Sequence, residues 1–443
     1  MNGFFHFFLS ALNPMANLGF SRGLAALMTS IDLWWWAFFV VVIIIGLLPS
    51  IICWLVYLVN PAAIRPPLPA RPIQVEPLVS VVSAGRNESA TIGHAIRGAL
   101  LCGYKNLEFI FVDDHSDDDS VVVARRAARS ITGSRWDAER VRIFPSPRRN
   151  GKASSLNIGI RMARGEFIAI TDADSVIQYG TIQHWLLPFA DPRVGAVAAN
   201  IRVRNMTAGF ITRFQELEYS LRFALTKYVL ARLNLMPVIP GMGGMFRAEI
   251  LHRLFGYDTG LGDDTDMTQM LRKQQWKLAF SFDAVVHTMV PATRAHLWNQ
   301  RMRWSRNAVK IRVSKHRELF VLGRFGFAAA VVVVRLLTSR WVQLWLLGIG
   351  AVILIAERGP LAVPEIVGMF YWIAVLVLMV RFLIARDICG TPTPVNFWLA
   401  PLYPFYLLSW AGPTIYAEFC EWFRIGIKHP YVPDHVWEEA PWW

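Results

Sequence analysis

Phe167-Ile168-Ala169-Ile170-Thr171-Asp172-Ala173-Asp174 is an apolar run that ends in two acidic residues one position apart. The run is short and rich in residues that favour strands, so it predicts a buried strand with both carboxylates at its carboxyl end. Two carboxylates at this spacing can reach the same hard cation or the polar groups around it. The stretch therefore predicts a strand and a polar site at its end.

Short apolar runs of the same kind recur on both sides of this strand and alternate with amphipathic stretches. Strands are predicted at Leu78–Ser83, Leu107–Val112, Val141–Phe144, Glu166–Ile170 and Val194–Ala199, and helices at Thr91–Leu101, Ser120–Ser130, Ala153–Ala163 and Thr181–Phe189. Such alternation predicts a mostly parallel sheet with helices on both faces. Ligands bind at the carboxyl ends of strands in these sheets. The residues that follow the first two strands there are Asn87, Glu88, Asp113 and Asp114.

Two further clusters lie downstream, Gly262-Asp263-Asp264-Thr265-Asp266 and Gln300-Arg301-Met302-Arg303-Trp304. They fit a site where a carboxylate removes a proton while an arginine and an indole hold an anionic leaving group and a flat polar acceptor. Acids also favour the start of a helix, so a simple cap of a helix at Met267–Lys273 is the alternative. Together with the paired acids upstream, the clusters indicate sugar transfer from a nucleotide donor.

The composition narrows the class of protein. Of 443 residues, 54% are hydrophobic and 17% are charged, so we expect the apolar residues to be segregated into their own segments. A net charge of +13 suits an anionic membrane surface. Nucleic acid would also suit this charge, but no helix-turn-helix or zinc-finger pattern is present. The four cysteines form no Cys-x-x-Cys pair, which argues against structural zinc and a disulfide framework.

The apolar segments predict a multi-pass protein of the cell (inner) membrane. Leu33–Val59 carries no charge and exceeds the roughly 20 residues that a membrane-spanning helix needs. Arg65 and Arg71 follow it and place the next domain in the cytoplasm. The expected order is 1–32 an interfacial or weak membrane segment, 33–59 a transmembrane helix, 60–77 a linker, 78–310 the cytoplasmic α/β domain with interfacial helices, 311–425 interfacial and transmembrane helices, and 426–443 a tail.

Several segments leave alternatives open. Ala208–Asn234 alternates charged and apolar residues at helical spacing, which fits a helix in the membrane interface or one on the domain's own core. Phe325–Ala356 is interrupted by Arg335 and Arg340, so it predicts an interfacial helix plus a span or two short spans. Val363–Ile384 and the proline-bent Asn396–Phe419 are further apolar segments.

The motifs, in this order, resemble those of membrane-integrated processive β-glycosyltransferases of glycosyltransferase family 2. That group includes poly-N-acetylglucosamine, hyaluronan, chitin and cellulose synthases. The resemblance covers about residues 78–310 and implies a GT-A-type, Rossmann-like α/β domain inserted between N-terminal and C-terminal transmembrane helices. It also implies a divalent cation (Mg²⁺ or Mn²⁺), a UDP-sugar donor, a growing polysaccharide acceptor and the lipid bilayer as partners. Small membrane or export proteins are possible further partners, and no nucleic acid is expected.

The resemblance implies a role for each motif residue. Nucleotide-sugar binding maps to Asn87, Glu88, Asp113, Asp114, Lys152 and Asp172, the metal to Asp174, the general base to Asp264, and the diphosphate and acceptor to Asp263, Gln300, Arg303 and Trp304. The chemistry of the residues agrees, because a sugar hydroxyl is a poor nucleophile that a positioned aspartate activates. A divalent cation and Arg303 would stabilise the leaving diphosphate.

The predicted activity is processive, inverting polymerisation of a UDP-activated sugar, with UDP-N-acetylglucosamine as the leading donor, into a β-linked polysaccharide that crosses the membrane. The nearer alternative is a non-processive membrane enzyme that adds one sugar to a lipid, as a ceramide glucosyltransferase does. The alternative from another class is a transporter or channel with a regulatory soluble domain. That reading needs charges inside the spans, and the candidates Arg335, Arg340 and Glu365 all lie near segment edges.

Overall fold

A computed structural model describes residues 55, 76–131, 140–258, 263–320, 343–389 and 397–423. The described residues divide into two compact units. One unit contains 343–366, and the other contains the remaining described residues, including the whole sheet. The expected segments 1–32 and 426–443, and all of 33–59 except Leu55, lie outside the described residues, as do Arg65, Arg71 and most of the linker.

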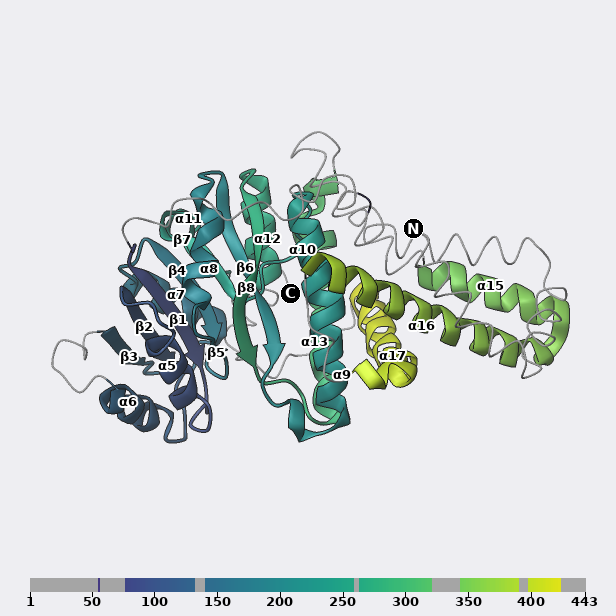
Figure 1. The fold of residues 1–443 in the computed structure, drawn as a ribbon, viewed down its shortest axis with the longest axis horizontal. Coiled ribbons are helices and arrows are strands. Elements are labelled where there is room, and N and C mark those ends of the chain that lie inside the picture. The colour runs from purple at the N-terminus through teal and green to yellow at the C-terminus, as the bar shows by residue number, and fades with distance from the viewer. Residues whose placement is uncertain are drawn as a thin grey trace. The chain divides into compact units, whose positions relative to one another are not determined.

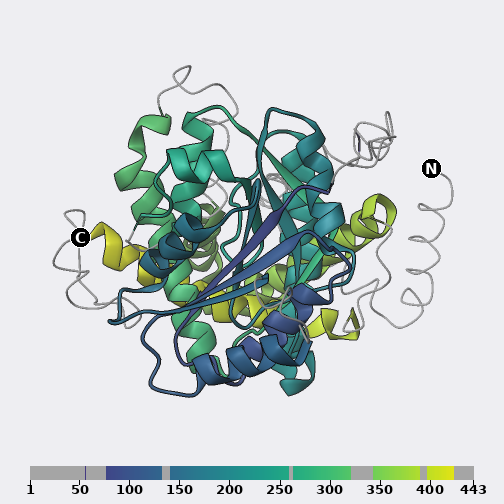
Figure 2. The same ribbon diagram turned by 90° about the vertical axis from the view of Figure 1, so that its left-hand side faces the viewer.

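The larger unit is built on an eight-stranded mixed sheet of described residues, with the order β3-β2-β1-β4-β7-β6-β8-β5 (Figure 1, Figure 2). Its parallel half consists of β1 (Val79–Gly85), β2 (Leu107–Asp113), β3 (Val141–Pro145) and β4 (Phe167–Asp172). Its other half consists of β5 (Val176–Ile177), β6 (Val194–Val203), β7 (Gly244–Arg247) and β8 (Lys277–Thr288). All five predicted strands are present, whereas β5, β7 and β8 were not predicted.

The strand β7 changes the direction of the sheet. It pairs antiparallel with both β4 and β6, and β6 then pairs parallel with β8. The sheet is therefore parallel from β3 to β4 and mixed beyond β4.

Helices cover both faces of the sheet, as the alternation predicted. The helices between the strands are α5 (Ile92–Leu100), α6 (Ser120–Ile131), α7 (Lys152–Met162), α8 (Thr181–Leu186) with η2 (Leu187–Ala190), and α11 (Ala248–Arg253). Successive side chains of a strand point to opposite faces. Accordingly Val82 joins a core with Leu156 of α7, while Val81 joins a second core with Ile96 of α5.

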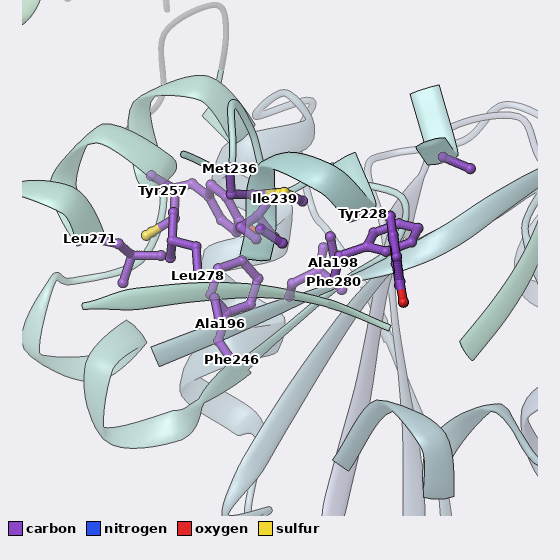
Figure 3. Close-up of a cluster of buried hydrophobic side chains, with 14 of the residues drawn as sticks. Ala196, Ala198, Tyr228, Met236, Ile239, Phe246, Tyr257, Leu271, Leu278 and Phe280 are labelled. Atoms are coloured by element: carbon purple, nitrogen blue, oxygen red, sulfur yellow. The ribbon is translucent and has the colours of Figure 1, made fainter. Parts of the chain in front are cut away.

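The first of these cores continues over the mixed half of the sheet. There α10 (Leu225–Arg232) and α12 (Asp263–Lys273) cover β6, β7 and β8, and Figure 3 shows the cluster extending from Leu271 to Tyr228 past Ala196 and Phe246. The segment before α10 consists of η3 (Met206–Ala208), α9 (Phe210–Glu218) and the π-helix η4 (Tyr219–Ala224). Side chains of α9, η4 and α10 are buried in this core, as the second alternative for this segment predicts.

Further elements of the larger unit follow β8. They include α13 (Arg294–Val309), the π-helix η5 (Lys310–Lys315), η6 (Arg317–Phe320), η9 (Phe397–Leu402) and α17 (Tyr403–Trp422). Several contacts join α13 to α17. Trp298 lies against Gly412, Ser305 donates to Thr414 at 3.2 Å, and Arg306 pairs with Glu421 at 2.6 Å. The motif helix α13 is therefore fixed by the C-terminal helix (Figure 1).

Helices also form where apolar segments were predicted near the C-terminus. These are α15 (Gln343–Arg358), η8 (Gly359–Leu361) and α16 (Ala362–Cys389). Within the part of the chain that the structure describes, no helix has the combination of length and apolar character that a membrane crossing requires. The transmembrane spans remain a prediction from the sequence.

Candidate active site

The residues at the carboxyl ends of the parallel strands are brought together by the strand register. Gly85 of β1 is paired with Asp113 of β2, and Ala84 is paired with Asp172 of β4. Since the strands are parallel, their following loops emerge at the same edge of the sheet. The acidic residues that the sequence places after three different strands therefore belong to one edge.

Asp113 and Asn87 fix the loops after β2 and β1 to each other. Asp113 is buried and accepts hydrogen bonds from the Ser116 backbone N–H at 3.0 Å and from its hydroxyl at 2.5 Å. Asn87 has a left-handed backbone with φ 59°, and its side chain accepts from the Asp117 N–H at 3.0 Å. Its own N–H donates to the Ser116 hydroxyl at 2.9 Å. The two loops form a single hydrogen-bonded unit.

Asp114 organises the turn in front of α7. Its carboxylate accepts from the N–H of Asn150 at 2.7 Å, from the N–H of Gly151 at 3.0 Å and from the hydroxyl of Ser155 at 3.0 Å. These bonds satisfy donors at the start of the helix, where backbone N–H groups lack partners within the helix. They hold the turn that leads into Lys152, the first residue of α7.

Lys152 lies between the acids of the site. Its Nζ donates to Asp172 at 2.5 Å. Burial opposes its charge, but the carboxylates of Asp172 and Asp263 raise the pKa of Lys152 above its ordinary range, with Arg303 acting in the opposite direction. Lys152 therefore lies between the end of β4 and the start of α12, within range of the Arg303 charge on α13. Its ammonium is charged at neutral pH.

The surroundings of Asp174 disfavour the negative charge of its side chain. Burial, followed by the negative charges of Asp172 and Glu88, raises the pKa of Asp174 to about 7. The Ser175 hydroxyl at 3.1 Å and the Thr288 hydroxyl at 3.1 Å oppose this rise. Burial and Asp172 also raise the pKa of Glu88, which accepts a hydrogen bond from Thr91 at 2.6 Å. Carboxylates crowded in this way favour a bound cation.

Asp263 and Asp264 occupy the first turn of α12. The Asp264 N–H donates to Asp263 at 3.0 Å, and Asp264 accepts from the Thr265 N–H at 2.7 Å. Burial raises the pKa of Asp263, and the nearby Asp264 adds to the rise while Lys152 opposes it. The helix therefore begins at Asp263, four residues before the Met267 start that the capping alternative assumed, and both acids lie in its first turn. Asp263 is also close enough to Asp172 at the end of β4 for their charges to interact.

The Gln-x-x-Arg-Trp motif lies in the middle of α13. Arg303 is close enough to Lys152 to affect its pKa, so α13 faces the donor edge of the sheet. The partly buried Trp304 lies with its ring centroid 4.4 Å from the Arg301 guanidinium and 6.1 Å from the ring of Phe223. The amide oxygen of Gln300 is buried and has no hydrogen-bond partner among the described residues. A substrate group that donates a hydrogen bond would satisfy it.

A metal ion would have to be held by few protein ligands. The described residues contain no group of three or more His, Cys, Asp or Glu side chains placed to hold one. Mg²⁺ is usually bound by one or two carboxylates together with substrate phosphates. The crowded Asp172 and Asp174 fit this arrangement, whereas a site made only of protein ligands does not.

Three features of the site were not predicted. The first is Lys227 of α10, a half-buried lysine whose nearby charge is Asp264. Burial lowers the pKa of Lys227 to about 8, while Asp264 acts in the opposite direction. Only the fold brings residues 227 and 264 together, so no local signal announced this pair.

The second is a clamp on the chain before Asp263. Asn157 of α7 accepts from the Tyr257 N–H at 2.7 Å and donates to the Tyr257 carbonyl at 2.6 Å. Gly256 precedes it at φ 82°, and a Cβ there would lie 2.1 Å from the Asn157 side-chain oxygen. The buried Tyr257 hydroxyl has no partner among the described residues. Only glycine at position 256 allows this clamp.

The third is Arg301, which the sequence places inside the motif without a role. It is fully buried and pairs with the buried Glu218 of α9 at 2.9 Å. Its partner is 83 positions away, so the pair could not be found from local spacing.

The glycines at 241–244 pack against the protein itself. Gly243 and Gly244 face Ile201 and Ile239, whereas Gly241 lies next to the Asp264 side chain. His287 lies in β8 and its ring contacts the Gln178 side chain at 3.1 Å. Gly243, Gly244 and His287 therefore serve the internal packing of the fold.

A family model described as "Glycosyltransferase like family 2" matches residues 77–307, a range that contains every residue predicted for the site. The chain belongs to this family. It is therefore a glycosyltransferase, and the resemblance stated from its motifs is confirmed.

Curated relatives of this glycosyltransferase include poly-β-1,6-N-acetyl-D-glucosamine synthases. The one from Staphylococcus aureus (strain COL) is 24% identical over 307 residues, which cover 68% of this chain and 72% of the relative. The one from Staphylococcus epidermidis is 26% identical over 235 residues, covering 53% of this chain and 55% of the relative.

A solved structure with the same fold is a mannosyltransferase from Pyrobaculum calidifontis in complex with GDP-Man and Mn²⁺. It aligns with a TM-score of 0.58 and 22% sequence identity, covering 86% of this chain and 98% of the other. The mixed α/β, GT-A-like architecture is thereby confirmed, and the flanking transmembrane helices stay a prediction.

Proposed function

We propose that this glycosyltransferase is a processive, inverting enzyme that polymerises UDP-N-acetylglucosamine into a β-linked polysaccharide and moves the product across the membrane. The observation that supports the proposal is the pairing of Lys152 with Asp172 at the end of β4. Asp263 and Arg303 are close enough to affect the pKa of Lys152, and Asp264 follows Asp263 in the first turn of α12. The similarity to poly-β-1,6-N-acetyl-D-glucosamine synthases supports a polymer of N-acetylglucosamine.

Asp264 acts as the general base in this proposal. It removes the proton from the acceptor hydroxyl as that oxygen attacks the anomeric carbon of the donor sugar, and the bond from that carbon to the diphosphate breaks. A positioned base contributes about 10²–10⁴ in rate. One displacement inverts the anomeric centre, so an α-linked donor gives a β-linked product.

Lys152 and Arg303 hold the leaving diphosphate. Both are cationic and near each other, at the start of α7 and in the middle of α13. Fixed positive charges placed where negative charge develops stabilise a transition state without reorganisation. The donor diphosphate would take over Lys152 from Asp172, its present partner.

Asp174, with Asp172 beside it, would hold the divalent cation. A bound Mg²⁺ or Mn²⁺ would supply positive charge against the diphosphate oxygens. The raised pKa of Asp174 supports this assignment, because a carboxylate crowded by Asp172 and Glu88 gains from a cation. A mannosyltransferase of the same fold forms a complex with Mn²⁺.

Nucleotide binding falls to the loops after β1 and β2. Asn87 and Asp113 lie in the joined loops at this edge, and Asp114 holds the turn before Lys152. Gln300 and Trp304 on α13 would meet the acceptor end of the polymer. A half-buried indole suits this task, since sugar faces stack on aromatic rings.

The membrane location rests on the sequence and on exposed apolar side chains. On α17, Phe405, Ile415 and Phe419 are each at least half exposed. Exposed apolar patches mark interaction surfaces. We infer that residues 78–310 face the cytoplasm, where nucleotide sugars are made, and that the uncharged Leu33–Val59 spans the inner membrane.

Reconstitution tests the proposal. The full chain in lipid vesicles, given UDP-N-acetylglucosamine and Mg²⁺, should make a polymer of many residues. Polymer that has crossed the vesicle membrane should resist a hydrolase added on the donor side. UDP-glucose and UDP-glucuronate serve as donor controls. A product that consists of a lipid bearing a single sugar would overturn the synthase proposal in favour of lipid glycosylation.

A further inference from the structure

A buried polar network joins three helices behind the acceptor motif. Glu218 at the end of α9 accepts from Arg301 of α13 at 2.9 Å and from the hydroxyl of Tyr406 of α17 at 2.8 Å. Arg301 also lies 3.3 Å from the Tyr406 hydroxyl. Arg301 and Glu218 are fully buried, and Tyr406 is 6% exposed. The three groups therefore exchange hydrogen bonds with one another in a region that water does not reach.

The network supports Trp304 directly. The Arg301 guanidinium lies 4.4 Å from the centroid of the Trp304 ring, within the range of a cation–π contact. Phe223 of η4 contacts the same indole at 6.1 Å. Trp304 is only partly buried, so the indole is held by the protein and still retains an accessible surface.

Aromatic stacking fixes the other end of the network. The ring of Phe214 on α9 stacks on Tyr406 with a centroid distance of 5.2 Å and an interplanar angle of 11°. The π-helix η4 begins directly after Glu218. π-helical turns inside helices occur frequently at functional sites. The change from α-helix to π-helix thus falls between Glu218 and Phe223. Glu218 acts on Trp304 through Arg301, whereas the ring of Phe223 contacts Trp304 directly.

Stability alone does not account for this arrangement. A buried ion pair contributes little net stability compared with apolar residues of similar volume, because both charges lose their hydration. What such a pair supplies is geometry, since each polar group accepts only a narrow set of partner positions. Arg301 pairs with a carboxylate on one helix and contacts an indole on its own helix, so the position of the carboxylate determines where the guanidinium lies beneath the ring.

We propose that Glu218, Arg301 and Tyr406 form a positioning network that sets the Trp304 indole for the acceptor and makes acceptor binding depend on the C-terminal helix α17. The inference rests on the proposed role of Trp304 at the acceptor end. It adds residues outside the motif, from helices before and after it, to the machinery of the site. They act through Trp304 and do not touch the substrate.

Tyr406→Phe is the sharpest test, because it removes one hydroxyl from the network and keeps the aromatic stack with Phe214. We expect the KM for an N-acetylglucosamine oligosaccharide acceptor to rise about tenfold, the effect of losing one hydrogen bond to a charged group. The KM for the nucleotide sugar should change less than about twofold, within the scatter of surface substitutions. The mean product length should fall, because the growing end dissociates sooner.

Thr414→Val is the matched control. It removes another hydrogen bond between α13 and α17, the one from Ser305 at 3.2 Å, without touching the network. A general loosening of the two helices would affect both variants alike. If Tyr406→Phe and Thr414→Val give the same acceptor KM and product length, the positioning role is wrong.

A double variant tests whether the groups act as one unit. Glu218→Gln keeps the size of the side chain and an acceptor oxygen but removes its charge, so it too should raise the acceptor KM. Residues in one network are not additive. The double variant of Glu218→Gln and Tyr406→Phe should therefore raise the acceptor KM by less than the product of the two single effects, and an additive result would contradict the network.

The controls separate this inference from the proposed function. The wild-type enzyme is first tested with UDP-N-acetylglucosamine for polymer synthesis, and a negative result there overturns only the proposed function. The variants are then compared with the wild type on whichever acceptor it extends. An unchanged acceptor KM in Tyr406→Phe overturns the network in either case.

Discussion

Replacing Lys227 with methionine should stabilise the enzyme at neutral pH. Lys227 is half-buried on α10, and burial lowers its pKa to about 8 from the ordinary 10.5, although Asp264 acts in the opposite direction. At pH 7 the side chain is charged in an environment that favours its neutral form. The charge therefore costs stability, and an apolar side chain of similar length avoids that cost.

The size and the pH range of this effect follow from the two pKa values. One pKa unit corresponds to about 1.4 kcal/mol, so the difference amounts to about 3 kcal/mol at most. Solvent that reaches the half-buried side chain reduces this figure. Below pH 8 both states hold the proton and the full cost is present. Between pH 8 and 10.5 the unfolded chain binds more protons than the folded one, so stability rises with pH.

Denaturant unfolding of the full chain in detergent measures this difference. Lys227→Met should raise the free energy of unfolding by about 1–3 kcal/mol at pH 7, and the gain should shrink as the pH approaches 10.5. Lys105→Met serves as the control, since Lys105 is exposed. A gain that is the same at pH 7 and pH 10, or no gain at all, would refute the electrostatic reasoning. The Lys227 ammonium is retained beside Asp264 although it lowers stability, and we infer that it contributes to sugar transfer. We therefore expect the stabilised Lys227→Met variant to transfer sugar more slowly.

Four further outcomes follow from the site and its placement. Asp264→Asn should keep donor binding and lower the transfer rate by about 10²–10⁴, and a variant that retains more than roughly a tenth of the rate would exclude Asp264 as the base. Excess chelator should abolish transfer and Asp174→Asn should weaken activation by Mn²⁺, so full activity in chelator contradicts the cation site. Asn157→Ala removes both hydrogen bonds to Tyr257 and should lower the free energy of unfolding by about 1–3 kcal/mol. An unchanged denaturation curve would mean that these two hydrogen bonds do not stabilise the fold. Protease added outside intact cells should leave residues 78–310 uncut; cleavage there would reverse the orientation.

The parallel half of the sheet could be predicted from sequence mainly because β1, β2 and β4 are buried on both faces. Such strands are nearly continuous apolar runs, as in Leu107–Val112 and Phe167–Ile170. In the mixed half β6 carries this signal and was predicted, whereas β5 and β7 do not. The strand β7 has four residues and begins with a glycine, and β5 has two residues. Strands this short form only because β4, β6 and β8 offer them partners, and that information is tertiary.

The residues of the site also divide into those that the sequence predicted and those that only the fold reveals. Strand ends and motif spacing were enough to bring Asp172, Asp264 and Arg303 into one hypothesis, because the topology of a parallel sheet puts loop residues at a common edge. The groups that surround them were missed. Arg301 finds its hydroxyl partner 105 positions away in Tyr406. Its role depends on how α13 and α17 pack, which no local pattern encodes.

The pairing of Lys152 with Asp172 bears on how the donor enters the site. Burial alone would favour a neutral lysine, yet the two nearby aspartates raise the pKa of Lys152 above its ordinary range. The ammonium is therefore already charged before the donor arrives, and a diphosphate can replace Asp172 as its partner without taking up a proton. In the proposed function the same exchange would release Asp172, which would then be available to the divalent cation that Asp174 would hold. Donor and cation should consequently strengthen each other's binding. The donor diphosphate frees Asp172 for the cation, and a cation that binds Asp172 frees Lys152 for the diphosphate.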